Sequence, residues 1–490
     1  MKRTDDFRKN TIKKLLITLI NTNLSRKGII SVVDNHVKKL MLSQENDTAF
    51  HKEKFAQYCF FKNSLRMFGK RMDENLLAKS VQKKLVGNLV NNIFLNGQET
   101  REDAYEKEGR SIPAFLVISP TKRCNLHCIG CYASSDSAHS PKLDWNTFDR
   151  ILTEKTKLWN SYFTVISGGE PFLWQDDGKD LFDMLERHND QFFLIYTNGT
   201  LINKKNAERL AELGNVTPAI SVEGFEKETD ERRGKGVHKK ILEAFSHLRE
   251  AGVLFGISVT ATRKNAEIIV SDKFIDFYFE KQKASYGWLF QYMPIGRDID
   301  FEYLITPQQR VSLYRKGKII NEEYGYDYMD FWNNGYLSTG CISAGRRGGY
   351  LYIDWNGNVT PCVFVPYSPV NINDVYKNGG NLNDVLEKPF FKDIREWQKS
   401  YGYLKKKEEA GNRIMPCIIR DHHEDFYNII KKYTVKPIDK PAKEALQSGA
   451  YHKHLIEYDK EIAKLLDKEW ENDFVKPELE LMKHSPKSFG

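Results

Sequence analysis

Six short runs rich in β-branched and aromatic residues alternate with helix-like segments between residues 113 and 294. Each β-plus-α unit spans about 30 residues, which predicts parallel strands joined by right-handed crossovers. Six such units are too few to close an eight-stranded barrel, so the alternation predicts an open, partial barrel. The predicted strands are Phe115–Thr121, Tyr162–Ser167, Phe192–Thr197, Thr217–Val222, Leu254–Ala261 and Trp288–Pro294.

Capping residues mark the ends of the intervening helices. Asp144 stands just before a helix predicted at Thr147–Leu158, and Gly214 closes a helix predicted at Lys204–Leu213. A serine is expected to cap a further helix at Ser271–Lys283. In parallel α/β folds ligands bind at the carboxyl ends of the strands, so the residues that follow each strand are the candidates for a site.

Four regions are expected along the 490 residues. A helical N-terminal region precedes the barrel, because apolar residues recur at three- and four-residue steps while Gly and Pro are rare. After the barrel, Asn356-Gly357 stands between two β-rich runs and predicts a β-hairpin within a small domain. A charged helical region follows it. The expected boundaries are 1–110, 111–330, 331–425 and 426–490.

Composition and charge argue against several classes of protein. The net charge is +8, from 74 Lys and Arg against 66 Asp and Glu, and the basic residues are dispersed, so no nucleic-acid partner is expected. No run of 18 apolar residues predicts a spanning helix, and the first residues lack the apolar core of a signal peptide. We expect a cytoplasmic protein. Its basic, amphipathic N-terminal region either packs on the barrel or makes peripheral contact with a membrane.

Three of the seven cysteines, Cys124, Cys128 and Cys131, fall within eight positions just after the first predicted strand. Thiolates at this C-x3-C-x2-C spacing suit an iron–sulfur cluster or zinc. Zinc normally takes a fourth protein ligand, and no fourth cysteine is close in the sequence. Three thiolates on a four-iron cluster leave one iron free to bind a substrate or cofactor.

A C-x3-C-x2-C motif after the first strand of a partial barrel resembles the radical S-adenosylmethionine (SAM) superfamily. The resemblance implies that Cys124, Cys128 and Cys131 hold a [4Fe–4S] cluster whose fourth iron binds the amino and carboxylate groups of SAM. One electron from the cluster then cleaves the sulfonium and gives a 5′-deoxyadenosyl radical that abstracts a hydrogen. The resemblance also implies an external one-electron donor similar to flavodoxin or ferredoxin.

The later strand ends carry residues that resemble the cofactor contacts of this family. Ser-Gly-Gly-Glu-Pro after the second strand resembles its GGEP motif, in which glycines let the backbone approach the ligand. Arg233 resembles the arginine that binds the cofactor's carboxylate, with Arg232 as a second candidate and a solvated helix start as the alternative. The expected cofactor-binding residues are Gly168, Gly169, Glu170, Asn198, Ser221, Glu223, Arg233 and Ser258.

Two residues depart from the family pattern. Glu223 stands where relatives carry Asp facing the ribose. Gly130 stands where the family usually has an aromatic residue against adenine, and a glycine there resembles the radical enzymes that act on hopanoid lipids. With the basic helical N-terminal region, Gly130 favours a lipid-like or other small apolar substrate.

Three further cysteines, Cys341, Cys362 and Cys417, follow the barrel. A Gly-Cys pair, the hairpin and a Gly-x-Val-x-Pro-Cys sequence resemble the SPASM or twitch extension of radical SAM enzymes, which implies one auxiliary iron–sulfur cluster. His422 or His423 is the candidate fourth ligand, and an iron left open for substrate is the other option. The alternative is a structural hairpin with free or zinc-bound thiols.

Three other residues have competing interpretations. Cys59 lies in an aromatic run and is expected to be a buried core thiol. Arg346 and Arg347 lie between two of the later cysteines and are flanked by glycines. They are expected either to bind a phosphate or carboxylate of the substrate or to form a solvated loop.

Together these residues predict a radical SAM enzyme, an oxidoreductase or a transferase, that abstracts hydrogen from an unactivated C–H bond. The substrate is expected to be lipid-like, another small apolar molecule, or a peptide. Two alternatives remain: a peptide- or protein-modifying maturase of the SPASM type, and a non-catalytic iron–sulfur or zinc scaffold that binds a partner. Cofactor-like residues at four strand ends argue against the scaffold.

Overall fold

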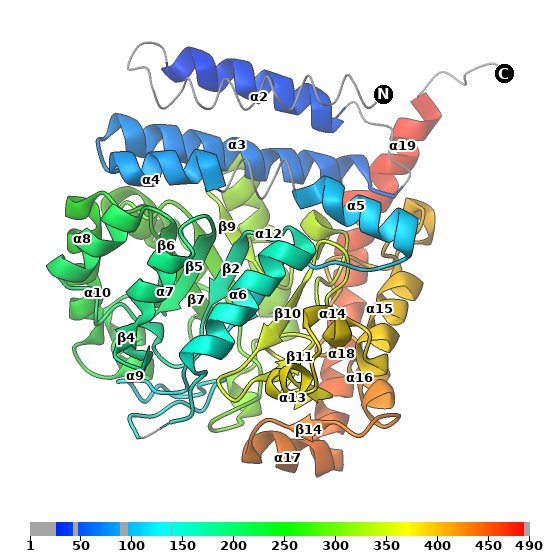
Figure 1. Cartoon of the computed structure of the whole chain (residues 1–490). Coiled ribbons are helices and arrows are strands. Elements are labelled where there is room, and N and C mark those ends of the chain that lie inside the picture. The colour runs from blue at the N-terminus through cyan, green and yellow to red at the C-terminus, as the bar shows by residue number, and fades with distance from the viewer. Residues whose placement is uncertain (1–25, 43–47, 89–96, 139, 485–490) are drawn as a thin grey trace.

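The computed structural model describes residues 26–42, 48–88, 97–138 and 140–484. Figure 1 shows a curved sheet surrounded by helices, with α2, α3 and α4 across one end and the long α18 against one flank. The N-terminal helices are α2 (Arg26–Leu42), α3 (His51–Asp73), α4 (Lys79–Lys84) and α5 (Gly97–Glu108).

One ten-stranded sheet forms the centre, in the order β13-β11-β10-β1-β2-β5-β6-β7-β8-β9. Every pair from β10 through β1 to β9 is parallel. The six predicted strands are confirmed, and β9 is an addition that the alternation did not predict. These strands are β1 (Phe115–Ile118), β2 (Phe163–Ile166), β5 (Phe192–Thr197), β6 (Val216–Val222), β7 (Gly256–Ala261), β8 (Gly287–Gln291) and β9 (Tyr328–Asp330).

The crossover helices cover the outside of the sheet and begin where their caps predict. The Asp144 side chain accepts a hydrogen bond from Thr147 N at 2.9 Å, and Gly214 ends α8 with a φ of 69°. Short strands β3 (Gln175–Asp176) and β4 (Lys179–Asp180) pair beside α7. The crossover helices are α6 (Trp145–Trp159), α7 (Leu181–Arg187), α8 (Lys204–Leu213), α9 (Glu226–Arg233), α10 (Val237–Ala251), α11 (Asp272–Ile275) and α12 (Pro307–Ile319).

The helix predicted at Ser271–Lys283 differs from the expectation. Ser271 caps it as predicted, but only α11 is α-helical, and residues Asp276–Lys281 continue as a π-helix. In these wider turns the consecutive Tyr278 and Phe279 are both buried, and Tyr278 Oη donates to Gly224 O at 2.6 Å.

Aromatic rings meet across the inside of the sheet. The centroids of Tyr196 on β5 and Phe290 on β8 are 5.4 Å apart, although β6 and β7 separate the two strands. Phe364, from the segment after β11, lies 5.9 Å from Phe290. The sheet therefore curls around its inner face, and the predicted partial barrel is confirmed.

The hairpin after the barrel is part of the same sheet. Asp354 Oδ1 accepts from Asn358 N at 2.9 Å, and the predicted Asn-Gly turn joins β10 (Tyr350–Ile353) to β11 (Asn358–Thr360). The hairpin is confirmed, but β10 also pairs in parallel with β1, Tyr350 opposite Phe115. The hairpin thus extends the barrel sheet at its β1 edge, which the sequence did not indicate.

The remaining C-terminal segments wrap this edge of the sheet. β13 (Val370–Asn371) pairs with β11, and β12 (Tyr367–Ser368) pairs with β14 (Lys436–Pro437). Within residues 331–425 the chain also forms α13 (Ile372–Lys377), α14 (Leu382–Leu386) and α15 (Pro389–Tyr401). The helices predicted for residues 426–490 are present as α16 (His423–Ile430), α17 (Lys440–Gln447), α18 (Gly449–Trp470) and α19 (Lys476–His484).

The N-terminal helices α3 and α4 pack on the barrel. Arg71 of α3 is buried and donates to Phe279 O at 2.8 Å and to Ala284 O at 3.0 Å, and Ser80 of α4 donates to Ala211 O. Within the described residues, no helix is both long enough and apolar enough to cross a bilayer. Residues 1–25, which carry part of the predicted basic amphipathic surface, lie outside the described residues.

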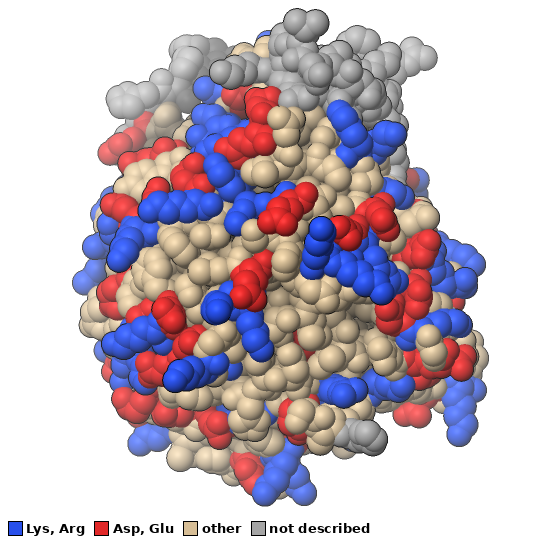
Figure 2. Space-filling view, turned by 90° about the vertical axis from the view of Figure 1, so that its left-hand side faces the viewer, with Lys and Arg blue, Asp and Glu red and all other residues tan. Residues whose placement is uncertain are grey.

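The face that carries α8 and α10 has a mixed charge. Figure 2 shows basic and acidic side chains interspersed over this face. Several of them are paired; Arg209 of α8, for example, lies 3.1 Å from Asp180. This face therefore presents charges of both signs side by side.

A buried ion pair ties α3 to the segment that precedes α16. Arg413 Nη1 donates to Glu53 Oε2 at 2.6 Å, and both side chains are almost fully buried. We expect Glu53→Gln to lower the free energy of unfolding by about 3–5 kcal/mol, because it leaves the Arg413 cation buried without its carboxylate. Chemical denaturation followed by circular dichroism measures the change.

The neighbouring Lys52 supplies the control for this prediction. Lys52 pairs with Glu322 at 2.7 Å, and the lysine side chain is 29% exposed. Lys52→Gln is expected to cost less than about 1 kcal/mol, because partly exposed ion pairs contribute little. Equal losses in the two variants would contradict the role given to the buried pair.

Candidate functional site

The first three cysteines lie in the loop that follows β1. Cys124 is 8% exposed, and Cys128 and Cys131 are partly buried. Burial raises the pKa of the Cys124 thiol to about 12, and charge on Cys128 and Cys131 acts in the same direction because the sulfurs lie near one another. Leu126 N donates to Cys124 Sγ at 3.4 Å. The loop therefore gathers three soft ligands at the carboxyl end of a barrel strand.

Two arginines from other strand ends fix the shape of this loop. Arg232 Nε donates to Ile129 O at 3.2 Å, and Ile129 N donates to Arg232 O at 3.0 Å. Arg297 Nη1 donates to Cys128 O at 3.0 Å, and its backbone N donates to Cys131 O at 2.9 Å. We did not predict this role for Arg297 from the sequence. Its position in the turn after β8, at a strand end that faces the site, could have indicated it.

Packing explains Gly130 without reference to a substrate. Its φ is 62°, and a Cβ there would lie 2.8 Å from Tyr292 Cε2. Tyr292 is buried just after β8, and its Oη donates to Asp298 O at 3.2 Å. An aromatic ring from another strand end therefore occupies the space that a side chain at 130 would need, so Gly130 no longer indicates a lipid.

The Gly168-Gly169 pair lets the cysteine loop approach the end of β2. Gly169 N donates to Thr121 O at 2.9 Å, and Glu170 N donates to Arg123 O at 2.8 Å. A Cβ on Gly169 would collide with Arg123 O. These glycines thus let the segment that leads to Cys124 pack closely on the end of β2, and their approach to a ligand stays a prediction.

Glu170 and Asn198 connect the ends of β2 and β5 to the same loop. Glu170 is fully buried; its Oε1 accepts from Thr197 Oγ1 at 2.7 Å and its Oε2 from Asn198 N at 2.8 Å. Burial raises the pKa of Glu170 to about 7. Asn198 Nδ2 donates to Asn125 Oδ1 at 2.9 Å and lies 3.8 Å from Cys124 Sγ.

A carboxylate with two arginines lies at the end of β6. Glu223 Oε1 accepts from Arg232 Nη1 at 2.6 Å and from Arg233 Nε and Nη2 at 2.8 and 2.5 Å. Glu223 Oε2 is buried and has no hydrogen-bond partner among the described residues. Burial alone would lower the pKa of Arg233, but the charges of Glu223 and Cys128 outweigh it, so the pKa is raised overall.

These groups fit a zwitterionic cofactor beside the first cysteines. The free oxygen of Glu223 can accept a hydroxyl or ammonium hydrogen, and the guanidinium of Arg233 suits a carboxylate. Ser221 and Ser258 lie opposite each other on β6 and β7, in the same sheet. The predicted cofactor residues thus follow, or lie within, four consecutive strands.

The fold also brings Cys341, Cys362 and Cys417 together. Burial raises the pKa of Cys362 to about 12, with a contribution from Cys341. Burial also raises the pKa of Cys417, and Asp421, Cys341 and Cys362 add to that rise. The three thiols, which lie about 20 and 55 residues apart in the chain, are therefore close enough for their charges to interact.

The second set lies at the other end of the inner face. Because β11 runs antiparallel to β10, the chain returns after β11 and Cys362 comes back beside Tyr350, the first residue of β10. Tyr350 Oη and Cys362 Sγ are 2.8 Å apart, and Ser343 Oγ lies 3.2 Å from Cys341 Sγ. The first set, in contrast, follows the carboxyl end of β1.

A buried cation without a carboxylate partner lies beside the second set. Arg346 is 3% exposed, and its Nη2 donates to Ser338 O at 2.5 Å and to Gly340 O at 3.2 Å. Its Nε and Nη1 have no hydrogen-bond partner in the described part of the chain. A buried cation in this state fits an anionic group such as a thiolate-bound cluster.

The two candidate histidines have partners of their own. His422 Nε2 donates to Met415 O at 2.8 Å. His423 is buried, with Nδ1 2.8 Å from Ile419 O and Nε2 2.9 Å from His452 Nδ1. Both ring nitrogens of His423 are thus engaged. No group of three or more His, Cys, Asp or Glu side chains in the described ranges is arranged for a single metal ion.

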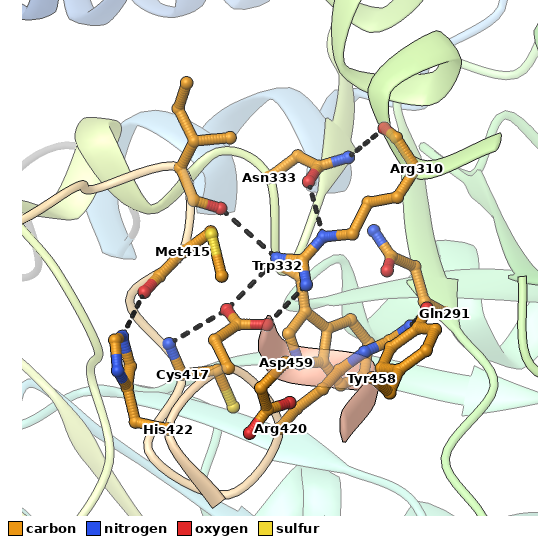
Figure 3. A network of polar contacts seen from close by, with 12 residues as sticks. Gln291, Arg310, Trp332, Asn333, Met415, Cys417, Arg420, His422, Tyr458 and Asp459 are labelled. Carbon is orange, nitrogen blue, oxygen red and sulfur yellow. Dashed lines mark hydrogen bonds and ion pairs between the residues drawn. The ribbon is translucent and has the colours of Figure 1, made fainter. Parts of the chain in front are cut away.

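An ion-paired network holds the Cys417 segment against the barrel. Asp421 Oδ2 accepts from Cys417 N at 3.2 Å and from Arg310 Nη2 of α12 at 3.0 Å. Arg310 Nε also donates to Asn333 Oδ1 at 3.0 Å. Figure 3 shows Arg310, Asn333 and Cys417 in this network, with His422 turned toward Met415.

An aromatic contact joins the two cysteine sets. Tyr132 directly follows Cys131, and Phe364 N donates to Cys362 Sγ at 3.5 Å. The centroids of Tyr132 and Phe364 are 6.2 Å apart. The sequence gave no sign of this contact, because 232 positions separate the two rings and neither lies in a motif.

Comparison with known proteins agrees with this arrangement. Residues 118–265 match the family model of the radical SAM superfamily, and residues 341–410 match the iron–sulfur cluster-binding domain called SPASM. The first domain implies a [4Fe–4S] cluster and SAM, and the second implies additional iron–sulfur clusters.

Three similar curated proteins illustrate the range of relatives. The Fe-coproporphyrin III synthase of Methanosarcina barkeri is 27% identical over 179 residues, covering 34% of this chain and 44% of that protein. The sporulation killing factor maturation protein SkfB of Bacillus subtilis is 28% identical over 272 residues, covering 51% and 60%. The mycofactocin maturase MftC of Mycobacterium tuberculosis is 27% identical over 306 residues, covering 60% and 75%.

The chain thus spans less than two thirds of the length of the first two relatives. The first match includes Cys124, Cys128 and Cys131, and the second includes Cys341 and Cys362. Cys417 lies beyond both matched ranges. The chain therefore carries a radical SAM domain and a SPASM domain.

Proposed function

We propose that the chain binds two iron–sulfur clusters and uses the first to cleave SAM reductively, with an electron from a flavodoxin- or ferredoxin-like donor. When bound, the first cluster and SAM supply a 5′-deoxyadenosyl radical that takes hydrogen from a C–H bond. The observation that carries the proposal is that two sets of three thiols lie beside one curved sheet, each set within electrostatic reach of its own members. The sets are Cys124, Cys128 and Cys131, and Cys341, Cys362 and Cys417.

The residues at the ends of β5 and β6 would orient SAM. The Glu223 oxygen without a partner accepts a hydrogen from the cofactor, and the Arg233 guanidinium binds its carboxylate. Asn198 holds the cysteine loop through Asn125, so cofactor and loop keep a fixed geometry. The contacts around the first set support these roles.

Aromatic rings between the two sets support a reaction that is shielded from water. Tyr132, Tyr196, Phe290 and Phe364 form a connected series of rings, with centroids 5.4 to 6.2 Å apart. Such rings exclude water and add no ionisable group near pH 7. A carbon-centred radical formed beside them would be protected from side reactions.

We propose a peptide precursor as the substrate. Two of the three relatives are maturation proteins, and they match over 272 and 306 residues, beyond the barrel. The packing of Tyr292 against Gly130 removes the residue that favoured a lipid.

Metal content tests the two-cluster proposal. The anaerobically reconstituted wild type is expected to bind about eight irons per chain, and Cys→Ala replacement of either full set is expected to leave about four. With dithionite and SAM, the variant without the first set forms no 5′-deoxyadenosine, because SAM loses its cluster. The variant without the second set still forms it. Iron analysis and chromatography measure both.

Cys59→Ala is the control for thiol loss. Cys59 is buried in α3, away from both sets, and its replacement should leave about eight irons and normal 5′-deoxyadenosine. About four irons per chain in the wild type would contradict the proposal of a second cluster. Undiminished formation of 5′-deoxyadenosine by the variant without the first set would contradict reductive cleavage of SAM at that set.

The binding of SAM tests the role of Arg233. Arg233→Gln is expected to weaken SAM binding by about 10- to 150-fold, because a charge-assisted hydrogen bond contributes about 1.5–3 kcal/mol. Ultrafiltration with labelled SAM on the reconstituted protein measures the dissociation constant. Lys264→Gln, which removes an exposed pair with Glu231, is the control and should leave binding unchanged. Equal binding by the two variants would refute the contact.

Isotope transfer tests the substrate class. Peptide and lipid fractions are prepared from source cells grown in D2O and incubated separately with the reconstituted enzyme, SAM and dithionite. We expect deuterium in 5′-deoxyadenosine from the peptide fraction, because the radical takes a carbon-bound deuterium from its substrate. Mass spectrometry measures it, and the same fractions from cells grown in H2O are the control. Transfer from the lipid fraction alone would overturn the peptide proposal.

A further inference from the structure

The second set of sulfurs has two hydroxyl groups within hydrogen-bond distance. Tyr350 is 1% exposed, and its Oη lies 2.8 Å from Cys362 Sγ. Ser343 is buried, and its Oγ lies 3.2 Å from Cys341 Sγ. A thiolate that binds iron carries no proton, so in the loaded protein both hydroxyls must act as the donors.

The first set is arranged differently. Cys124 Sγ accepts from Leu126 N at 3.4 Å and from the Asn198 amide at 3.8 Å, both longer than the contact of Tyr350. Near this set, Arg232 and Arg233 share the single carboxylate of Glu223. The two sets therefore place different polar groups around their sulfurs.

Arg346 adds an uncompensated positive charge beside the second set. It lies close enough to Cys341 for their charges to interact, and the ring of Tyr403 is 4.0 Å from its guanidinium. Two of its nitrogens lack partners among the described residues. Its charge is therefore available to an anion at this site.

We propose that the Tyr350 hydroxyl, assisted by Ser343 and Arg346, raises the reduction potential of the second cluster. The inference rests on the proposed function, which supplies that cluster. Reduction adds one electron and one negative charge; no covalent bond changes, and Tyr350 keeps its proton. Hydrogen bonds to sulfur and a nearby cation stabilise the more negative state, so they shift the equilibrium toward reduction.

The test isolates the second cluster. Cys124, Cys128 and Cys131 are all replaced by Ala, so that only the second cluster contributes a signal. The midpoint potential is then measured in the full-length reconstituted chain by redox potentiometry, with the reduced cluster detected by electron paramagnetic resonance. In this background Tyr350→Phe is expected to lower the midpoint, because it removes the hydroxyl and keeps the ring.

Tyr352→Phe is the matched control. Tyr352 is also buried and on the same face of β10, two residues further along, but its Oη donates to Ser119 Oγ at 2.8 Å. Removal of this hydroxyl should leave the midpoint unchanged. Arg346→Gln should lower the midpoint, while Arg346→Lys, which keeps the charge, should lower it less.

The outcomes separate the inference from the proposed function. About four irons per chain with the same midpoint in Tyr350→Phe would overturn the inference and leave the second cluster in place. If the variant that lacks Cys124, Cys128 and Cys131 binds no iron, the proposal of a second cluster is wrong, and the inference falls with it. If Tyr350→Phe binds less iron, Ser343→Ala provides the comparison: a lower midpoint supports the inference, and an unchanged one overturns it.

Discussion

The parallel pairing of β10 with β1 is the constraint on which the two sites depend. It places Tyr350 opposite Phe115 and Tyr352 opposite Val117, so both tyrosines lie on the inner face with the barrel side chains. The same β1 strand leads, at its carboxyl end, into the first three cysteines. The β1 strand therefore leads into the first set and also positions Tyr350, the neighbour of Cys362 in the second set.

Buried polar contacts hold Cys417, the last cysteine of the second set, in place. Cys417 belongs to an irregular segment, and its backbone is tied to Asp421, which pairs with Arg310 of α12 (Figure 3). Charges buried in this way are stable only when the geometry satisfies most of their hydrogen bonds. Arg310 meets that condition through Asn333 and Ile414 O as well as Asp421. The position of Cys417 is thus determined by a helix that lies about 100 residues earlier in the chain.

Local patterns predicted the parts of the fold that depend on neighbours in the sequence. The alternation of strands, the cap at Asp144 and the turn at Gly357 all act within a few residues, and the structure confirms them. Contacts between distant segments had no such signal. The approach of Tyr292 to Gly130 and of Tyr350 to β1 depends on how the sheet curls, which no local periodicity encodes.

The two cysteine sets differ in how much of the chain each needs. The first occupies one loop of eight residues, whose shape is fixed by Arg232 and Arg297 from later in the barrel. The second exists only after residue 417 has been synthesised and the Arg310–Asp421 pair has closed. Because domains fold progressively during synthesis, the two sets become available at different times. The chain therefore presents its two sets of ligands in order: all three thiols after β1 are in place about 290 residues before Cys417, the last thiol of the second set.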